Sequence, residues 1–186
     1  MKKKEEDENT GFPVSRTNVV NGSRRLVREK VMQILVSHYV SNTPIDTIFE
    51  HIFYRNFNVE EMIYSSDDVG AVKVRSDEEL TDMLADATIH WKDGEVEFGK
   101  HLIDSVLKHY DDVLAKLVSI SDNWDVSRMP MIDRTIIVMA ASEMSDFPSI
   151  PKDVSINEAV ELAKKYSTDK SHTFVNGILD KIKQDL

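Results

Sequence analysis

Three arginines, Arg24, Arg25 and Arg28, lie close together at the start of an amphipathic stretch. Guanidinium groups can bind phosphates through paired hydrogen bonds and can stack on unpaired bases. Cations at a helix N-terminus oppose the helix dipole, so a phosphate chain would be a suitable partner for this locally unfavourable arrangement. The alternative is a solvated face that pairs with acidic residues elsewhere in the chain. The spacing alone leaves both interpretations open.

A second candidate lies near the C-terminus, at a polar corner before the last predicted helix. Lys170, Ser171 and His172 stand at the start of that helix, where free backbone N–H groups attract phosphate. Phe174 could stack on a base, although a phenylalanine on an apolar stripe is more often part of the core. We predict that this corner binds an anionic ligand.

Other polar residues are predicted to hold helices together. For Asp133, Arg134 and Glu143 we expect capping and ion pairing between helices, because buried charges are usually paired. Gly177 lies inside a predicted helix, at a cost of up to about 1 kcal/mol relative to alanine. We therefore expect another helix to pack closely against Gly177.

The sequence gives no support for catalysis. It contains no glycine-rich phosphate loop, no Gly-x-Ser-x-Gly and no His-Glu-x-x-His. Without cysteine there is no thiolate zinc site and no cysteine nucleophile. His101 and His109 each lie near a carboxylate, but they are two helical turns apart, too far for one metal. We expect no enzymatic activity, no cofactor and no metal.

The net charge of −10 does not exclude an anionic partner. Residues 43–99 carry the excess acid, whereas residues 23–42 are locally basic. Phosphate binding depends on the charge at the contact, while global charge mainly changes long-range steering. No apolar run is long enough to span a membrane, and no apolar segment follows the N-terminus as a secretory signal would require. A cytoplasmic location fits these features.

Hydrophobic periodicity predicts helices along most of the chain. Ser23 is expected to cap a helix over 24–41. A second helix is expected over 45–57, with Thr43 as its cap and Pro44 in its first position.

The segments around and between the following helices are less regular. Residues 1–22 are predicted to be a flexible tail, and residues 58–76 an irregular insertion. Ser76 is expected to cap a helix that runs to about Lys92. Asp93 and Gly94 are predicted to form a turn before a long helix over 96–118.

The last third of the chain is predicted to be a helical hairpin. Pro151 cannot continue a helix from upstream. Ser155 and Glu158 have the spacing of a capping box, so a helix is expected to open there. A polar run over 167–171 separates it from a final helix. Two amphipathic helices joined by a short corner need the rest of the chain to cover their apolar stripes.

This hairpin carries a resemblance to a known family. The segment INEAVELAKKYSTDKSHTFVNGILDKI resembles the C-terminal signature of the NusB family, including the runs Asn157-Glu158-Ala159 and Phe174-Val175-Asn176-Gly177. RRLVREKVMQIL resembles the arginine-rich first helix of that family, and WDVSRMPMIDRTIIVMAASEM resembles its next motif. The resemblance covers about residues 23–57 and 95–184.

The resemblance implies an all-α fold of two small packed helical bundles, over residues 23–120 and 121–186. It also implies a non-catalytic RNA-binding transcription antitermination factor. Such a factor binds the boxA element of nascent RNA together with the ribosomal protein NusE, supporting ribosomal RNA synthesis. The N-terminal arginines would hold the RNA backbone, and the corner at 170–174 would add contacts. The acidic segment 77–97 could face the basic NusE, and a homodimer is possible.

One departure from the family pattern bears on the partners. The family commonly has a tyrosine where this chain has Val36, which puts contacts from that position in doubt. Two alternatives stay open: a helical protein–protein adaptor without RNA binding, and an RNA-binding module related to that of ribosomal RNA methyltransferases.

Overall fold

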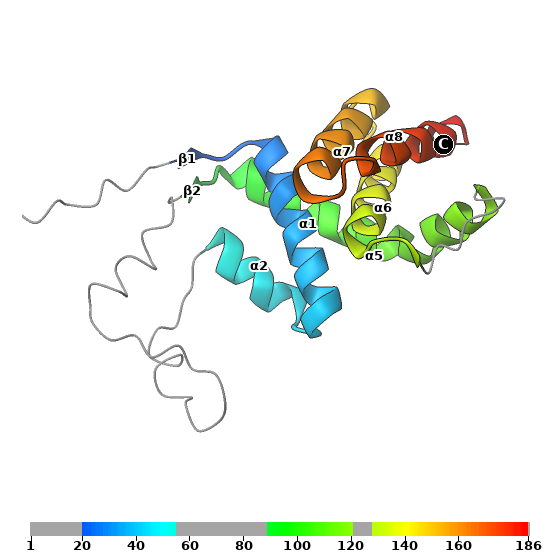
Figure 1. The fold of residues 1–186 in the computed structure, drawn as a ribbon. Coiled ribbons are helices and arrows are strands. Elements are labelled where there is room, and N and C mark those ends of the chain that lie inside the picture. The colour runs from blue at the N-terminus through cyan, green and yellow to red at the C-terminus, as the bar shows by residue number, and fades with distance from the viewer. Residues whose placement is uncertain (1–19, 55–88, 121–127, 186) are drawn as a thin grey trace, which may run out of the picture. The chain divides into compact units, whose positions relative to one another are not determined.

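The fold is known from a computed structural model, which describes residues 20–54, 89–120 and 128–185. These residues are predominantly helical, which confirms the expected all-α class (Figure 1). The helices are α1 (Arg24–Ser41), α2 (Ile45–Phe53), α5 (Asp93–Ile120), α6 (Met131–Asp146), α7 (Lys152–Tyr166) and α8 (Ser171–Gln184).

Two very short strands belong to a unit separate from the one that holds the helices. β1 (Val20–Asn21) pairs in parallel with β2 (Ile89–His90). The prediction of a helix from Ser76 to about Lys92 is therefore wrong at its C-terminal end, because Ile89 and His90 are extended in β2. The predicted Ser76 cap and the insertion over 58–76 lie outside the described residues.

Helix α6 is the centre of the helical unit, which spans Gly22–Asn58 and Trp91–Leu186. It packs against α1, α5, α7 and α8 (Figure 1). Its residues from Thr135 to Met144 are all buried. A helix that is covered on all sides must satisfy its few polar groups internally. Thr135 Oγ1 accordingly donates to the carbonyl oxygen of Met131 at 2.8 Å.

Helix α1, which carries the arginines, has the predicted bounds of 24–41. The Leu26 N–H donates to Ser23 Oγ at 3.2 Å, so Ser23 is the expected N-cap. At the other end Asn42 adopts a left-handed conformation with φ 55°, and its N–H donates to the His38 carbonyl at 2.9 Å. Asparagine tolerates this conformation better than most residues, and it ends the helix.

Three other predicted boundaries are wrong. Thr43 makes no side-chain cap for α2, whose N-cap position is Pro44. Asp93 and Gly94 are the first residues of α5 and not a turn. Helix α7 begins at Lys152, three residues before the Ser155 that was expected to cap it. The Ser155 hydroxyl is buried and donates to the Glu143 carboxylate, so it serves tertiary packing.

The two informative glycines have opposite surroundings. A Cβ at Gly177 would meet nothing within 4 Å, so the expected close packing against this glycine is wrong. A Cβ at Gly99 would lie 3.1 Å from Val27 Cγ1 and 3.2 Å from Phe53 Cζ. The close approach of α1, α2 and α5 therefore depends on Gly99.

We expect Gly177→Ala to stabilise the protein. The side chain enters open space inside α8, and alanine loses less conformational freedom in a helix than glycine. The free energy of unfolding should rise by roughly 0.5–1 kcal/mol, measured by urea denaturation followed by circular dichroism. A loss of stability would show that this position does pack against another group.

Candidate nucleic-acid interface

Arg24 and Arg25 are exposed on the first turn of α1. The Arg24 guanidinium carbon lies 5.2 Å from the centre of the Phe98 ring. Arg25 Nε donates to Glu158 Oε2 at 2.9 Å, and its Nη2 donates to Glu158 Oε1 at 2.7 Å. This hydrogen bond and the carboxylate charge raise the pKa of Arg25. Both side chains are held by contacts and still present guanidinium groups to solvent.

Arg28 lies in the core. Its Nε donates to Glu143 Oε2 at 2.7 Å and its Nη2 donates to Glu143 Oε1 at 2.6 Å. The two side chains are 6% and 1% exposed. Ser155 Oγ donates to the same carboxylate at 2.7 Å, so α1, α6 and α7 meet at one ion pair. An enclosed guanidinium cannot reach a phosphate, so we do not retain Arg28 as an RNA contact.

The contact between α1 and α7 contains a second cluster that sequence reasoning missed. Lys165 Nζ donates to both carboxylate oxygens of Glu29 at 2.9 Å, and the Tyr166 hydroxyl donates to Glu29 Oε1 at 2.6 Å. Burial opposes ionisation of Glu29, but the hydrogen bonds from Lys165 and Tyr166 outweigh it and lower the pKa of Glu29. The hydrogen bond to Glu29 raises the pKa of Lys165. Glu29 and Lys165 are 136 positions apart, which no local pattern reveals.

The corner before α8 is only partly accessible. Lys170 is exposed, and His172 is half-buried. Ser171 is buried, and its hydroxyl donates to Asp133 Oδ2 at 2.8 Å. Phe174 is partly buried and packs against the hydrophobic core. The structure thus leaves Lys170 and His172 available to a ligand and gives Ser171 and Phe174 structural contacts.

Asp133 and Glu143 bond to other helices, the role that sequence analysis favoured for them. Besides its bond with Ser171, Asp133 has a buried Oδ1 without a hydrogen-bond partner among the described residues. Asn176 Nδ2 donates to Asp180 Oδ2 one turn along α8, at 2.8 Å. Asn157 is exposed on α7.

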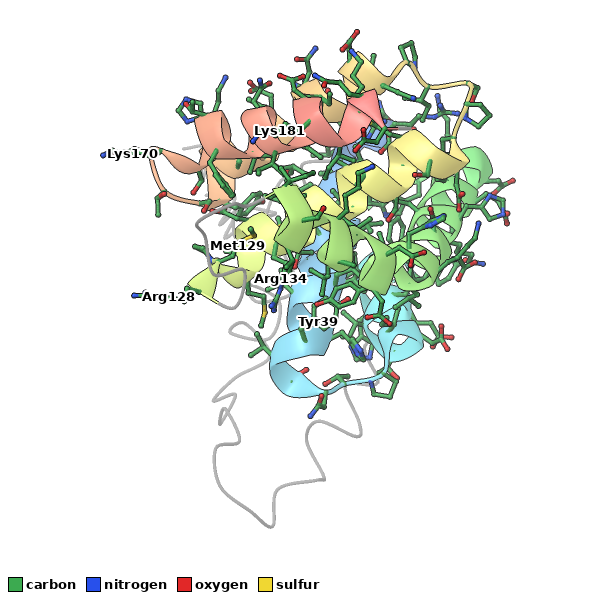
Figure 2. All side chains as sticks on the ribbon, turned by 90° about the vertical axis from the view of Figure 1, so that its right-hand side faces the viewer. Tyr39, Arg128, Met129, Arg134, Lys170 and Lys181 are labelled. Atoms are coloured by element: carbon green, nitrogen blue, oxygen red, sulfur yellow. The ribbon has the colours of Figure 1, made fainter. Side chains whose placement is uncertain are left out.

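Arg134 lies near the aromatic pair of Tyr39 and Tyr110, whose ring centres are 5.5 Å apart. Burial is the main cause that raises the pKa of Tyr39 to about 12, and the Arg134 charge acts in the opposite direction. In Figure 2 the side chains of Lys170 and Arg128 extend outward at the edge of the molecule, whereas Arg134 lies close against the helices.

The described part of the chain contains neither a candidate metal site nor a candidate membrane-spanning helix. No group of three or more His, Asp or Glu side chains among the described residues could hold a metal ion. No helix over the same ranges is long and apolar enough to cross a membrane.

Comparison with known proteins points to one family. The NusB family model matches residues 25–184. The transcription antitermination protein NusB of Chloroherpeton thalassium is 34% identical over 158 residues, covering 85% of this chain and 60% of that protein. The protein of the same name from Bacillus subtilis is 32% identical over 163 residues, covering 88% of this chain and 96% of that protein.

A solved structure shows the same fold. The crystal form titled "T. maritima NusB, P3121, Form 2" matches with a TM-score of 0.57 and 24% identity, over 89% of this chain and 94% of that one. The chain spans about three fifths of the length of the first curated relatives that it matches, for example 60% of the Chloroherpeton thalassium protein. The family model covers most of the sequence. The chain belongs to the NusB family.

Proposed function

We propose that this chain is a non-catalytic transcription antitermination factor that binds single-stranded boxA RNA of nascent transcripts together with the ribosomal protein NusE. Family membership and the names of the relatives support the antitermination role. The observation that carries RNA binding is the exposure of Arg24 and Arg25 at the N-terminus of α1.

The two arginines are suited to hold an RNA backbone. Each guanidinium is held from one side, Arg24 by the Phe98 ring and Arg25 by Glu158. Arginine has five N–H donors, and Glu158 uses only Nε and Nη2 of Arg25. Donors therefore remain for a phosphate, and a guanidinium that is already oriented loses less entropy on binding.

The corner before α8 provides a second group of contacts. Lys170 occupies the N-cap position of α8, and the first turn of α8 contains no acidic residue. The positive end of the helix dipole and the Lys170 ammonium would both attract phosphate. His172 adds a half-buried donor at the same end of the helix.

Arg24→Ala/Arg25→Ala tests the assignment. The double variant should bind a short single-stranded boxA-like RNA more weakly than the wild type. The slope of log affinity against log salt should become shallower by about 0.7 for each phosphate that the variant no longer neutralises. Fluorescence anisotropy over a salt series, with and without NusE, measures both quantities.

A matched control and two outcomes complete this test. Lys181→Ala removes an exposed cation from the last turn of α8, at the end of the helix opposite Lys170, and should leave affinity and slope unchanged. Equal binding by the double variant and the wild type would place the RNA site elsewhere. If the wild type binds NusE but no RNA, with or without NusE present, the protein is an adaptor.

The NusE surface is assigned on charge alone. We propose that the acidic segment 77–97 faces the basic NusE, and Asp93, Glu95 and Glu97 are its described members on α5. Replacing the acids of this segment by neutral amides should lower NusE affinity, measured by calorimetry. Unchanged NusE affinity would refute this part of the proposal.

A further inference from the structure

The ion pairs between helices differ in which partner faces solvent. Where α1 meets α7 the cation lies outside: Arg25 is 65% exposed above Glu158 at 15%, and Lys165 is 58% exposed above Glu29 at 14%. Where α7 meets α8 the order is reversed, since Lys183 is 36% exposed and Asp153 is 74% exposed. An anionic partner would therefore meet cations at the contact between α1 and α7.

We propose that Arg25 and Lys165 form a continuous phosphate-binding track along the contact between α1 and α7, which leads RNA from the N-terminal arginines to the Lys170 corner. This inference rests on the proposed function and extends its RNA surface to a residue that sequence reasoning missed. Glu158, Glu29 and Tyr166 position the two cations and do not themselves contact RNA.

The spacing of the helices supports a track. Arg25 and Glu29 are one turn apart on α1, which is about 6 Å along the helix axis. Arg25 is bonded to Glu158 and Lys165 is bonded to Glu29, so the two ion pairs follow one another along the contact between α1 and α7. Lys165 is also five positions before Lys170, at the end of α7 that leads into the corner.

The recessed carboxylates hold the cations in place. Lys165 Nζ bonds to Glu29 and also lies 5.1 Å from the centre of the Tyr166 ring. The Tyr166 hydroxyl donates to Glu29 at 2.6 Å and accepts from Gln33 Nε2 at 3.2 Å. A lysine usually loses much side-chain entropy when a ligand immobilises it, and these contacts reduce that loss.

The test compares variants of the full chain that are expected to change RNA affinity in opposite directions. Lys165→Ala should weaken binding of the boxA-like single-stranded RNA and reduce the salt slope by about 0.7, the value for one phosphate contact. Glu29→Gln removes the recessed negative charge, while the amide oxygen of glutamine can still accept a hydrogen bond from Lys165 and keep it in position. It should tighten binding roughly 2- to 5-fold at low salt. Glu29→Gln/Lys165→Gln should bind more weakly than Glu29→Gln.

Lys108→Ala is the matched control. Lys108 is 64% exposed and pairs with Asp146, so it resembles Lys165 in charge and exposure, but it joins α5 to α6. RNA affinity should not change in this variant. Proper folding of each variant is checked by circular dichroism and by NusE binding.

The outcomes separate this inference from the proposed function. If Arg24→Ala/Arg25→Ala weakens binding and Lys165→Ala does not, RNA binds at the arginines but does not follow the track, and the inference is overturned. The same holds if Lys108→Ala weakens binding as much as Lys165→Ala, because the effect is then one of net charge. If the wild type binds no RNA, the proposed function fails first.

Discussion

Glu143→Ala should destabilise the protein by about 3–5 kcal/mol, because it leaves the Arg28 guanidinium buried and unpaired. Both side chains are almost fully enclosed, and two hydrogen bonds of 2.6 and 2.7 Å join them. Ser155 would lose its acceptor on the same carboxylate, which adds a buried hydroxyl without a partner. Urea denaturation followed by circular dichroism measures the loss, as a shift of the midpoint.

A double-mutant cycle separates the pair from its surroundings. Arg28→Met/Glu143→Leu removes both charges and keeps apolar volume, so it should cost much less than the two single changes together. Lys183→Ala, which removes a partly exposed ion pair with Asp153, should cost less than about 1 kcal/mol. A Glu143→Ala variant as stable as this control would mean that water or a rearranged side chain satisfies Arg28.

The pair also explains how the candidate RNA surface is presented. Arg28 fixes the first turns of α1 to α6, and Glu143 in turn receives Ser155 of α7. Arg25 is thereby set against α7 and Arg24 against Phe98 of α5. The buried Arg28 thus anchors α1, while the exposed Arg24 and Arg25 on the same helix remain available to a ligand.

Sequence reasoning placed Arg28 with its neighbours because the three arginines are close in the chain. The sequence also contains a pattern that argues against an exposed Arg28, because Val31, Met32 and Leu35 follow it at the spacing of one buried helix face. A charged residue on such a face must find a buried partner. The partner, Glu143, is 115 positions away, and its identity depends on how α1 packs against α6.

The error at Ser155 has the same origin. The Ser155-x-x-Glu158 spacing fits a capping box, but Ser155 also precedes Ala159, Leu162 and Ala163 on a buried stripe. Burial took precedence over local capping. By contrast, the bounds of α1 were predicted correctly, because Ser23 caps through a contact only three residues away. Contacts between residues close in the chain can be predicted from the sequence pattern, whereas contacts between helices can be predicted only once the packing of the helices is known.

Gly99→Val should destabilise the protein by about 1–3 kcal/mol or more, through overpacking of the core where α1, α2 and α5 meet. The first added carbon would already lie 3.1 Å from Val27 Cγ1 and 3.2 Å from Phe53 Cζ. Valine adds two further methyl groups to that space. The Phe53 ring cannot retreat freely, because it stacks on Phe49 with ring centres 4.4 Å apart.

A change at Gly99 should also disturb RNA binding through α1. Gly99 follows Phe98 on α5, and the Phe98 ring contacts Arg24 of α1. Gly99 itself faces Val27, which is also on α1. Displacing α1 from α5 would separate Arg24 from that ring and loosen the orientation of its guanidinium. Gly177→Ala is the matched control, because it also fills a helical glycine but enters open space. Urea denaturation and RNA anisotropy on both variants measure the two effects. If Gly99→Val were as stable as Gly177→Ala and bound RNA as the wild type does, the tight junction of α1, α2 and α5 could not be what holds Arg24 in place.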